Sequence, residues 1–224
     1  MKTDFDIKND VIAELKWIPF LNSTEFGVTV NDGIVTLSGI VDTYSKKMAA
    51  EMAVKKVGGV KVVAEDIVVA IPTEKVKKDT EIAQAISKAL KWHSAFIENN
   101  IKVIVDSGIV KLEGDVEWEF QKDSAQLMIM DLAGVKSIIN NIKLKPKVKA
   151  SPELIKRNIV SAFHRSATIN SENISIEIIG NKAILRGHVY SWLEKDDAEK
   201  TAWSVSGIEN VDNRLEINTE ELIF

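Results

Sequence analysis

The 224-residue sequence predicts an α+β protein made of three tandem repeats, each with the order helix, strand, strand, helix, strand. The first observation is a glycine register, in which equivalent glycines are spaced by 75 and then 73 residues. The second is the patterning between the glycines, where helical apolar spacing gives way to strict alternation. We expect a three-stranded sheet in each repeat, covered on one face by two helices. The glycines of the register are Gly39, Gly114 and Gly187, followed by Gly59, Gly134 and Gly207.

The first helix of each repeat is predicted from apolar residues four positions apart, which form one stripe on a helix surface. We expect each stripe to pack on the sheet of its own repeat. The three stripes are Ile7, Val11 and Leu15; Ile82, Ile86 and Leu90; and Ile155, Ile159 and Phe163.

A hairpin of two strands follows the first helix. In the first repeat Phe26, Val28 and Val30 alternate with polar residues, which is the period of a strand with one buried face. The turn Asn31-Asp32-Gly33 then offers residues that tolerate positive φ, and a second alternating strand starts at Val35. The other two repeats show the same pattern.

A second helix and a last strand complete each repeat. Ala50, Ala53 and Val54 have helical spacing in the first repeat, and Ser191-Trp-Leu-Glu194 has the pattern of a capping box at the start of this helix in the third. The last strand of the first repeat runs through Val63 and Ile67.

The two glycine sets have separate expected roles. A glycine at position 39, 114 or 187 removes a side chain from the second strand, and we expect a helix to approach the sheet closely there. A glycine at position 59, 134 or 207 is expected to end the second helix as a C′ residue.

The repeats place the domain boundaries at 1–71, 79–146 and 151–218, joined by lysine-rich linkers. Charge differs between the segments. The middle segment, 75–150, has 13 basic and 10 acidic residues, whereas the first has 8 and 11 and the third has 8 and 12. The middle, basic domain is therefore the expected docking site for an anionic partner.

Composition excludes several classes of protein. The net charge of −4 argues against nucleic-acid binding, and the absence of cysteine excludes disulfide scaffolds, thiol nucleophiles and cysteine-ligated zinc. Asp4, Asp6 and Asp10 stand where a signal peptide needs an apolar core, and no apolar run approaches the roughly 20 residues of a membrane span. We expect a cytoplasmic protein, or a periplasmic one if a leader has been removed.

No constellation of residues predicts catalysis. The histidines His93, His164 and His188 are scattered, whereas a metal site needs three or four ligands at defined spacing. The acidic pairs Asp196-Asp197 and Glu220-Glu221 are adjacent in sequence, and adjacent helical residues point apart. We expect no catalytic residues, no cofactor and no metal, and therefore no enzymatic activity.

Aromatic residues are the best candidates for binding contacts. Several follow the second strand of each repeat, where they suit a membrane interface or a protein contact; capping the small core is the alternative. Trp17 and Trp92 end the first helix of their repeats, and the pair Lys91-Trp92 resembles a membrane-anchoring corner, with core packing as its alternative. The candidate membrane or partner contacts are Lys91, Trp92, Trp118, Phe120, Tyr190 and Trp192.

The sheet face opposite the helices differs between repeats. In the first repeat it carries Thr29, Ile34, Thr36 and Ile40 and is quite apolar, whereas in the second it carries Lys102, Ile104, Lys111 and Glu113. An open face with isoleucines is expected to be covered, by another domain or another chain.

The repeat resembles the BON domain family of bacterial proteins. The matching motifs are V-x-L-x-G in the second strand, and a later Gly-Val followed by V-x-N-x-I. The first repeat departs from the second motif, with Glu65 where the others have Asn140 and Asn213. The matching segments are Val35-Thr-Leu37-Ser-Gly39, Val110-Lys-Leu112-Glu-Gly114, Ile184-Leu-Arg-Gly187, Gly134-Val135 with Asn140-Asn-Ile142, and Gly207-Ile208 with Asn213-Arg-Leu215.

This resemblance implies an αββαβ fold, no catalysis, and association with phospholipid membranes, the envelope and osmotic or other stress. We therefore predict a non-enzymatic binding protein whose partner is a phospholipid membrane surface or a protein, with no nucleic acid. The alternative is a cytoplasmic scaffold or protein-interaction module that self-associates and so forms a homo-oligomer. The alternative accounts better for the acidic balance and for a start without a leader.

Overall fold

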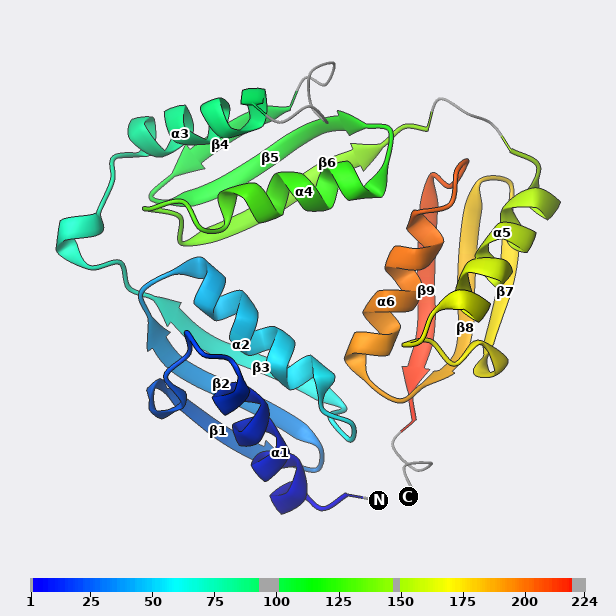
Figure 1. Ribbon diagram of the computed structural model, residues 1–224, viewed down its shortest axis with the longest axis horizontal. Coiled ribbons are helices and arrows are strands. Elements are labelled where there is room, and N and C mark those ends of the chain that lie inside the picture. Colours follow the sequence, from blue (N-terminus) through cyan, green and yellow to red (C-terminus); the bar gives the residue numbers. More distant parts are fainter. Residues whose placement is uncertain (1, 93–100, 147–149, 219–224) are drawn as a thin grey trace. The chain divides into compact units, whose positions relative to one another are not determined.

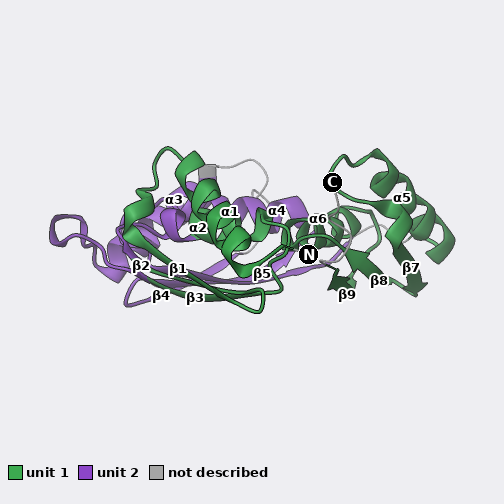
Figure 2. Cartoon of the chain, turned by 90° about the horizontal axis from the view of Figure 1, so that it is seen from below, with its two compact units in different colours: residues 1–39, 48–67, 148–224 green, residues 40–47, 68–147 purple. Residues whose placement is uncertain are grey.

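A computed structural model describes residues 2–92, 101–146 and 150–218 of the chain (Figure 1). It contains three separate three-stranded sheets, each with its second strand in the centre, which confirms the predicted α+β class and the threefold repeat. The chain divides into two compact units, one of residues 1–39, 48–67 and 148–224 and the other of residues 40–47 and 68–147 (Figure 2).

The three repeats have the same element order. Domain 1 comprises α1 (Asp4–Trp17), β1 (Phe26–Asn31), β2 (Ile34–Val41), α2 (Tyr44–Lys56) and β3 (Val62–Val69). Domain 2 comprises α3 (Asp79–Trp92), β4 (Lys102–Asp106), β5 (Ile109–Val116), α4 (Glu119–Ile129) and β6 (Ser137–Leu144). Domain 3 comprises α5 (Pro152–Arg165), β7 (Ile174–Ile179), β8 (Lys182–Val189), α6 (Trp192–Trp203) and β9 (Asn210–Ile217).

Each sheet joins an antiparallel hairpin to a parallel strand. In domain 1 the hairpin places Val28 opposite Leu37, and in domain 3 it places Ile176 opposite Leu185. The last strand pairs in parallel with the second strand in domains 2 and 3. A parallel neighbour requires a crossover, and the second helix of each domain supplies it.

Each domain buries the predicted apolar stripe of its first helix. Ile7, Val11 and Leu15 are buried in domain 1, and the equivalent stripes of α3 and α5 are buried as well. In domain 3 the stripe joins a core cluster whose members all come from that domain. Figure 1 shows α5 and α6 lying over one face of the sheet β7–β9. The predicted arrangement of two helices on one sheet face is therefore confirmed.

The motif glycines of the second strand contact a different neighbour from the one predicted. A Cβ atom at Gly39 would collide with the carbonyl oxygen of Glu25, and one at Gly187 with that of Asn173. These carbonyls belong to short 3-10 turns that lead into the first strand, so the prediction that a helix approaches here is wrong. The reason is the hairpin register, which sets Gly39 opposite Phe26 and brings the entering turn against the strand.

The second glycine set lies in the turn after the second helix, because each helix ends a few residues earlier. Gly59, Gly134 and Gly207 have φ of 99°, 96° and 93°, a conformation that favours glycine. A Cβ atom at Gly134 would lie 2.6 Å from Cδ1 of Ile82, so this turn packs against the first helix.

The motif asparagines fasten the second helix to the last strand. The side-chain amide of Asn140 donates to the carbonyl of Lys122 at 3.0 Å, and that of Asn213 donates to the carbonyl of Lys195 at 3.2 Å. The Asn213 side-chain oxygen also accepts from the backbone N–H of Leu215 at 3.2 Å. An asparagine suits this position because it donates and accepts at once.

Candidate binding surfaces

The aromatic residues that follow the second strand are mostly part of the fold. Tyr44 is buried, and Trp118, Tyr190 and Trp192 are half-buried. The hydroxyl of Tyr190 accepts a hydrogen bond from the side-chain amide of Asn173 at 3.0 Å. These contacts favour the core-capping alternative for this group over free membrane anchors.

Trp192 also contributes to the packing of its own domain. Its indole Nε1 is buried and has no hydrogen-bond partner among the described residues. The ammonium of Lys195 lies 5.3 Å from the centroid of its ring, within range of a cation–π contact.

A buried polar side chain fixes the aromatic corner in domains 2 and 3: Gln121, which sequence reasoning missed, and Glu194, which it named only as part of a helix cap. Gln121 accepts hydrogen bonds through Oε1 from the backbone N–H groups of Glu117 and Trp118, both at 3.0 Å. Glu194 accepts from the N–H of Tyr190 at 2.8 Å and from that of Asn170 at 2.7 Å. The corner before the second helix is therefore fixed by hydrogen bonds in domains 2 and 3.

The capping pattern at the start of α6 is formed in part. Ser191 is the N-cap, and its hydroxyl accepts from the N–H of Glu194 at 3.1 Å, as the pattern predicts. The carboxylate of Glu194 is the sequence signal that pointed to this site, although it binds the N–H of Tyr190 rather than that of the N-cap.

Phe120 is the most exposed of the candidate aromatics in the described part of the chain, at 58%. Leu127 lies seven residues later on α4 and is 61% exposed. Residues seven apart share one helix face, so α4 presents two apolar side chains to solvent.

The end of α1 is the most exposed aromatic feature of domain 1. Trp17 is 80% exposed and Phe20 is 56% exposed, with the exposed Lys16 beside them. Leu21 is buried directly after this tip, and its N–H donates to the carbonyl of Ile18 at 3.0 Å. We call residues 16–20 the α1 tip.

Trp17 does not pack in the core of its domain. The buried stripe of α1 ends at Leu15, and two residues further the helix has turned by about 200°. Trp17 therefore points away from the sheet. In domain 2, Lys91 is exposed in the equivalent place and Trp92 is the last residue of α3, but the side chain of Trp92 lies outside the described residues.

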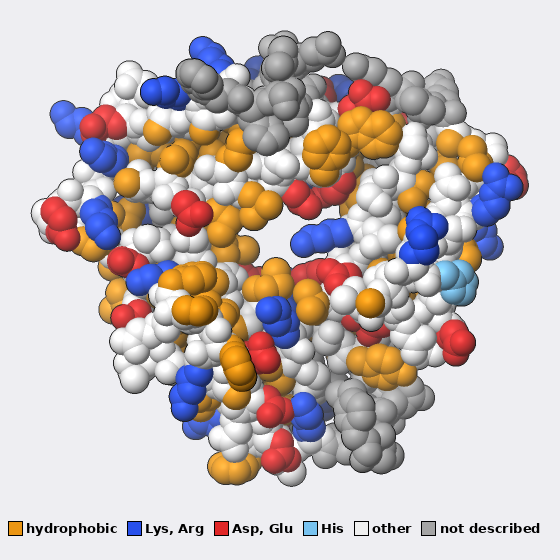
Figure 3. All heavy atoms as spheres, viewed as in Figure 1, with side chains coloured by type: hydrophobic (Ala, Val, Ile, Leu, Met, Phe, Trp, Pro, Cys, Tyr) orange, Lys and Arg blue, Asp and Glu red, His pale blue; other side chains and the backbone are white. Residues whose placement is uncertain are grey.

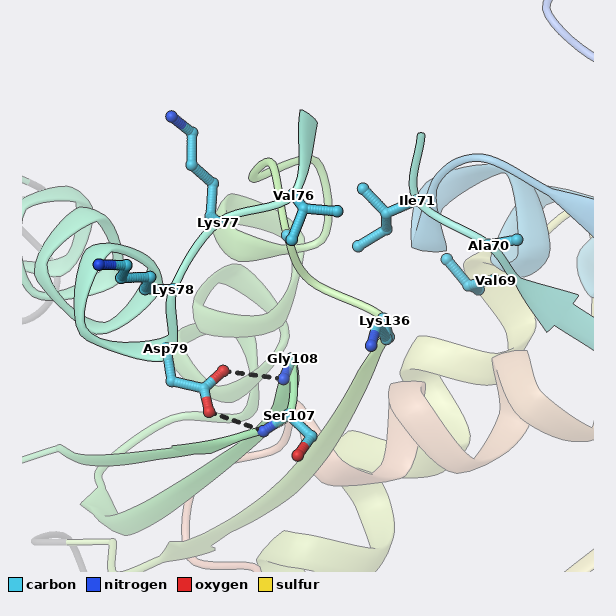
Figure 4. Close-up of a pocket in the computed structure, with 11 residues that line it drawn as sticks. Val69, Ala70, Ile71, Val76, Lys77, Lys78, Asp79, Ser107, Gly108 and Lys136 are labelled. Atoms are coloured by element: carbon cyan, nitrogen blue, oxygen red, sulfur yellow. Dashed lines mark hydrogen bonds between the residues drawn. The ribbon is translucent and has the colours of Figure 1, made fainter. Parts of the chain in front are cut away.

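Domains 1 and 2 share an aspartate that binds the hairpin turn. The carboxylate of Asp79 accepts from the N–H groups of Ser107 at 2.7 Å and Gly108 at 3.0 Å (Figure 4). Asp4 accepts in the same way from Asp32 at 2.7 Å and Gly33 at 2.9 Å. Domain 3 has Pro152 at this position, where no carboxylate is available.

A hollow of about 600 Å³ lies where Asp79 binds the hairpin turn, and it is lined by Lys77, Lys78 and Lys136 together with apolar residues. Both carboxylate oxygens of Asp79 are occupied by the turn, so this acid is committed to structure. Lys77 and Lys78 extend away from Gly108 in Figure 4. The carboxylate of Asp79 therefore stabilises the hairpin turn and is not a free acid or base facing the hollow.

The remaining polar candidates do not come together as a catalytic or metal site. Ser171 Oγ lies 3.1 Å from Nδ1 of His164 at an exposed surface, and His188 is exposed on β8. No group of three or more metal-ligating side chains occurs within residues 2–92, 101–146 and 150–218. His93 and the pair Glu220-Glu221 lie outside the described residues.

Charged side chains of both signs are mixed over the face drawn in Figure 3. Among the described segments, no helix has the length and apolar character needed to cross a bilayer.

Comparison with known proteins assigns the repeats to one family. The model of the BON domain matches residues 3–71, 78–146 and 152–219. The chain is 30% identical to the osmotically-inducible protein Y of Escherichia coli K12 over 129 residues, which is 56% of this chain and 64% of that protein. The chain thus spans less than two thirds of this relative.

Two further similarities are more distant. An uncharacterized protein encoded in the gshII 5′ region of Anaplasma centrale is 27% identical over 121 residues, 53% of this chain and 80% of that protein. A solved structure of CdsD, a structural protein of the type III secretion system of Chlamydia trachomatis, aligns over 96% of this chain and 94% of its own, with 16% identity and a TM-score of 0.28. Because the BON model covers the repeats almost end to end, the chain belongs to the BON domain family, of which it contains three tandem copies.

Proposed function

We propose that this BON protein is a non-catalytic binding protein that associates with phospholipid membranes and acts in the response to osmotic stress. The observation that carries the membrane proposal is the α1 tip, where Trp17 is 80% exposed beside an exposed lysine. The stress proposal rests on the 30% identity to the osmotically-inducible protein Y.

Tryptophan and lysine together suit the boundary between water and lipid. The indole ring has a large apolar surface and a polar N–H, and tryptophan is enriched at membrane interfaces for this reason. Lys16 can lay its methylene chain along the apolar layer while its ammonium stays among the headgroups. Full burial of a large apolar side chain contributes about 1.5–3 kcal/mol, so one tip gives weak, reversible binding.

Domain 2 adds the equivalent tryptophan of the sequence, Trp92, and the positive charge. Lys91 is exposed at the end of α3, next to Trp92, and Lys77, Lys78 and Lys88 are also exposed on this helix or just before it. Each lysine close to an anionic bilayer contributes about 1 kcal/mol. Two such tryptophans on one chain increase the affinity further when both can reach the same surface.

The candidate residues therefore fall into two groups, those proposed to contact the membrane and those that stabilise the fold. Lys91, Trp92 and Phe120 remain proposed membrane contacts, and Trp17 joins them. Trp118, Tyr190 and Trp192 support the fold through the contacts described above, and we expect their replacement to lower stability first.

Co-sedimentation with vesicles tests the proposal. We expect binding to vesicles that contain phosphatidylglycerol, and a loss of roughly tenfold in affinity for Trp17→Ala and for Trp92→Ala. Phe5→Ala is the matched control, because Phe5 is 71% exposed on the same helix but near its other end. Absence of binding to vesicles of either charge, or an equal loss in the Phe5 control, would refute the membrane proposal.

A further inference from the structure

The sheet face of domain 1 that points away from its helices is unusually apolar. Strand β2 exposes Ile34 at 42% and Ile40 at 64%, and strand β3 exposes Val62 at 47% and Val68 at 59%. The half-buried Thr36 lies between the isoleucines on β2. We call this surface, made by the outward residues of β1, β2 and β3, the open face of domain 1.

The open face of domain 1 carries almost no charge. Its outward positions on β1 are Gly27, Thr29 and Asn31, and the remaining position on β2 is Ser38. Asp66 is the one charged residue among the outward positions of these three strands. The four aliphatic side chains together expose roughly 400 Å², which is the size of patch that usually marks a contact surface.

Domains 2 and 3 show that the fold does not require an uncharged face. The equivalent face of domain 2 also exposes Ile104, Ile109 and Ile139. It differs in charge, because Lys102, Lys111 and Glu113 are exposed among these isoleucines. In domain 3 the face is laced with ion pairs, with Asp212 at 2.8 Å from both Lys182 and Arg214. Three sheets of one architecture thus differ on the side that plays no part in their own cores. The fold therefore does not explain why the open face of domain 1 has so little charge.

The composition of this face favours a second copy of the same face as its partner. An anionic membrane would select lysine or arginine at the rim, yet the outward positions of β1, β2 and β3 contain neither. A charged protein partner would likewise select complementary charge. An apolar, hydroxyl-bearing surface is complementary to itself, and a two-fold contact presents one patch to the same patch. We propose that the open face of domain 1 is the interface of a homodimer.

The size of the face fits a weak dimer. Three strands of up to eight residues, spaced by about 4.8 Å with a rise of about 3.3 Å per residue, give a footprint of roughly 14 by 26 Å. Two such footprints total roughly 700 Å², which is the size of a weak, transient interface rather than of a standard one. Sheets that pack face to face keep their strands within about 30° of each other, so the side chains of both faces can interdigitate. We expect dissociation constants in the micromolar range.

Sedimentation velocity of the full chain at about 1 to 100 µM tests the dimer in the range expected for this area. The wild-type protein shifts from monomer to dimer with concentration. Ile40→Lys raises the dissociation constant by at least roughly tenfold, because a charge enters an apolar contact. Ile179→Lys is the matched control: Ile179 is an isoleucine exposed at 58% on β7 of domain 3, and its replacement leaves the dimer unchanged.

A cross-link gives a second readout that does not depend on the lysine variant folding. The chain has no cysteine, so Ser38→Cys places a single thiol on the open face. Under mild oxidation it forms a disulfide-linked dimer, whereas Glu113→Cys at the equivalent position of domain 2 stays monomeric. A chain that remains monomeric at every concentration overturns the inference, as does equal weakening by both lysine variants or equal cross-linking of both thiols.

Vesicle binding separates this inference from the membrane proposal. If Ile40→Lys abolishes co-sedimentation while the wild-type chain is monomeric, the open face binds lipid and the dimer is refuted. If Trp17→Ala loses vesicle binding but keeps the dimer, both proposals stand.

Discussion

The carboxylate of Glu194 offers the sharpest test of how domain 3 is held together. Its side chain is buried at 6% exposure and accepts two backbone hydrogen bonds, at 2.7 Å from Asn170 and 2.8 Å from Tyr190. Asn170 leads into the first strand of the domain, whereas Tyr190 precedes its second helix. One side chain thus ties two segments that are distant in sequence.

Glu194→Ala removes both acceptors and leaves two shielded N–H groups. A hydrogen bond to a charged group contributes about 1.5–3 kcal/mol net, and neighbouring bonds are not additive, so we expect a loss of about 3 kcal/mol. A domain of this size has roughly 3–10 kcal/mol of stability in all. The population of the open domain then rises by roughly 150-fold.

Hydrogen exchange measured by mass spectrometry localises this effect. Amides of β8 and α6 should exchange roughly 100-fold faster in Glu194→Ala, while amides of domain 2 keep their rates. Glu194→Gln should lose only about 1 kcal/mol, because Gln121 shows that one amide oxygen can accept two such bonds. Unchanged exchange in the alanine variant, or equal loss in the glutamine variant, would refute this account of the clamp.

Three further predictions concern domain 3. Gly187→Ala should destabilise the domain by about 3 kcal/mol or more, because φ is 122° and a Cβ would meet a backbone carbonyl; Gly180→Ala, with nothing within 4 Å, should cost about 1 kcal/mol in the same denaturation assay. Asn213→Ala should cost about 1–2 kcal/mol, measured by urea unfolding, and a loss within error would contradict its fastening role. Hydrogen bonding from Arg214 holds the pKa of the Asp212 carboxyl well below its usual range, so its stabilising effect is full above about pH 4 and is lost as pH falls toward the lowered value. Asp212→Asn should therefore reduce the loss of domain 3 stability at low pH, measured by urea unfolding between about pH 2 and pH 5. An unchanged pH dependence would show that this ion pair does not contribute to stability.

The repeat, the element order and the buried stripes could be predicted from sequence because burial follows a period. Ile7, Val11 and Leu15 have helical spacing, their counterparts in the other two domains have the same spacing, and all three stripes are buried. The exposure of Trp17 was also available from that spacing, since it lies off the stripe by two residues.

Contacts between distant segments could not be predicted in this way. Asn170 and Glu194 are 24 residues apart, and Asp79 binds a turn 28 and 29 residues later. Nothing in the local pattern around either acid names its partner. The same holds for Gly39, whose empty side was expected to face a helix and instead faces the carbonyl of Glu25.

Each sheet in this chain is completed by a strand that lies a single helix away from its central partner. The hydrogen bonds of one domain are therefore all available once about 70 residues have been made, before the next domain emerges from the ribosome at roughly 5–20 residues per second. Three segments with nearly the same apolar pattern would otherwise be prone to exchange strands with one another. Early closure of each sheet within its own segment removes that hazard during synthesis, and it leaves slow refolding of the whole chain from denaturant as the condition under which strand exchange arises.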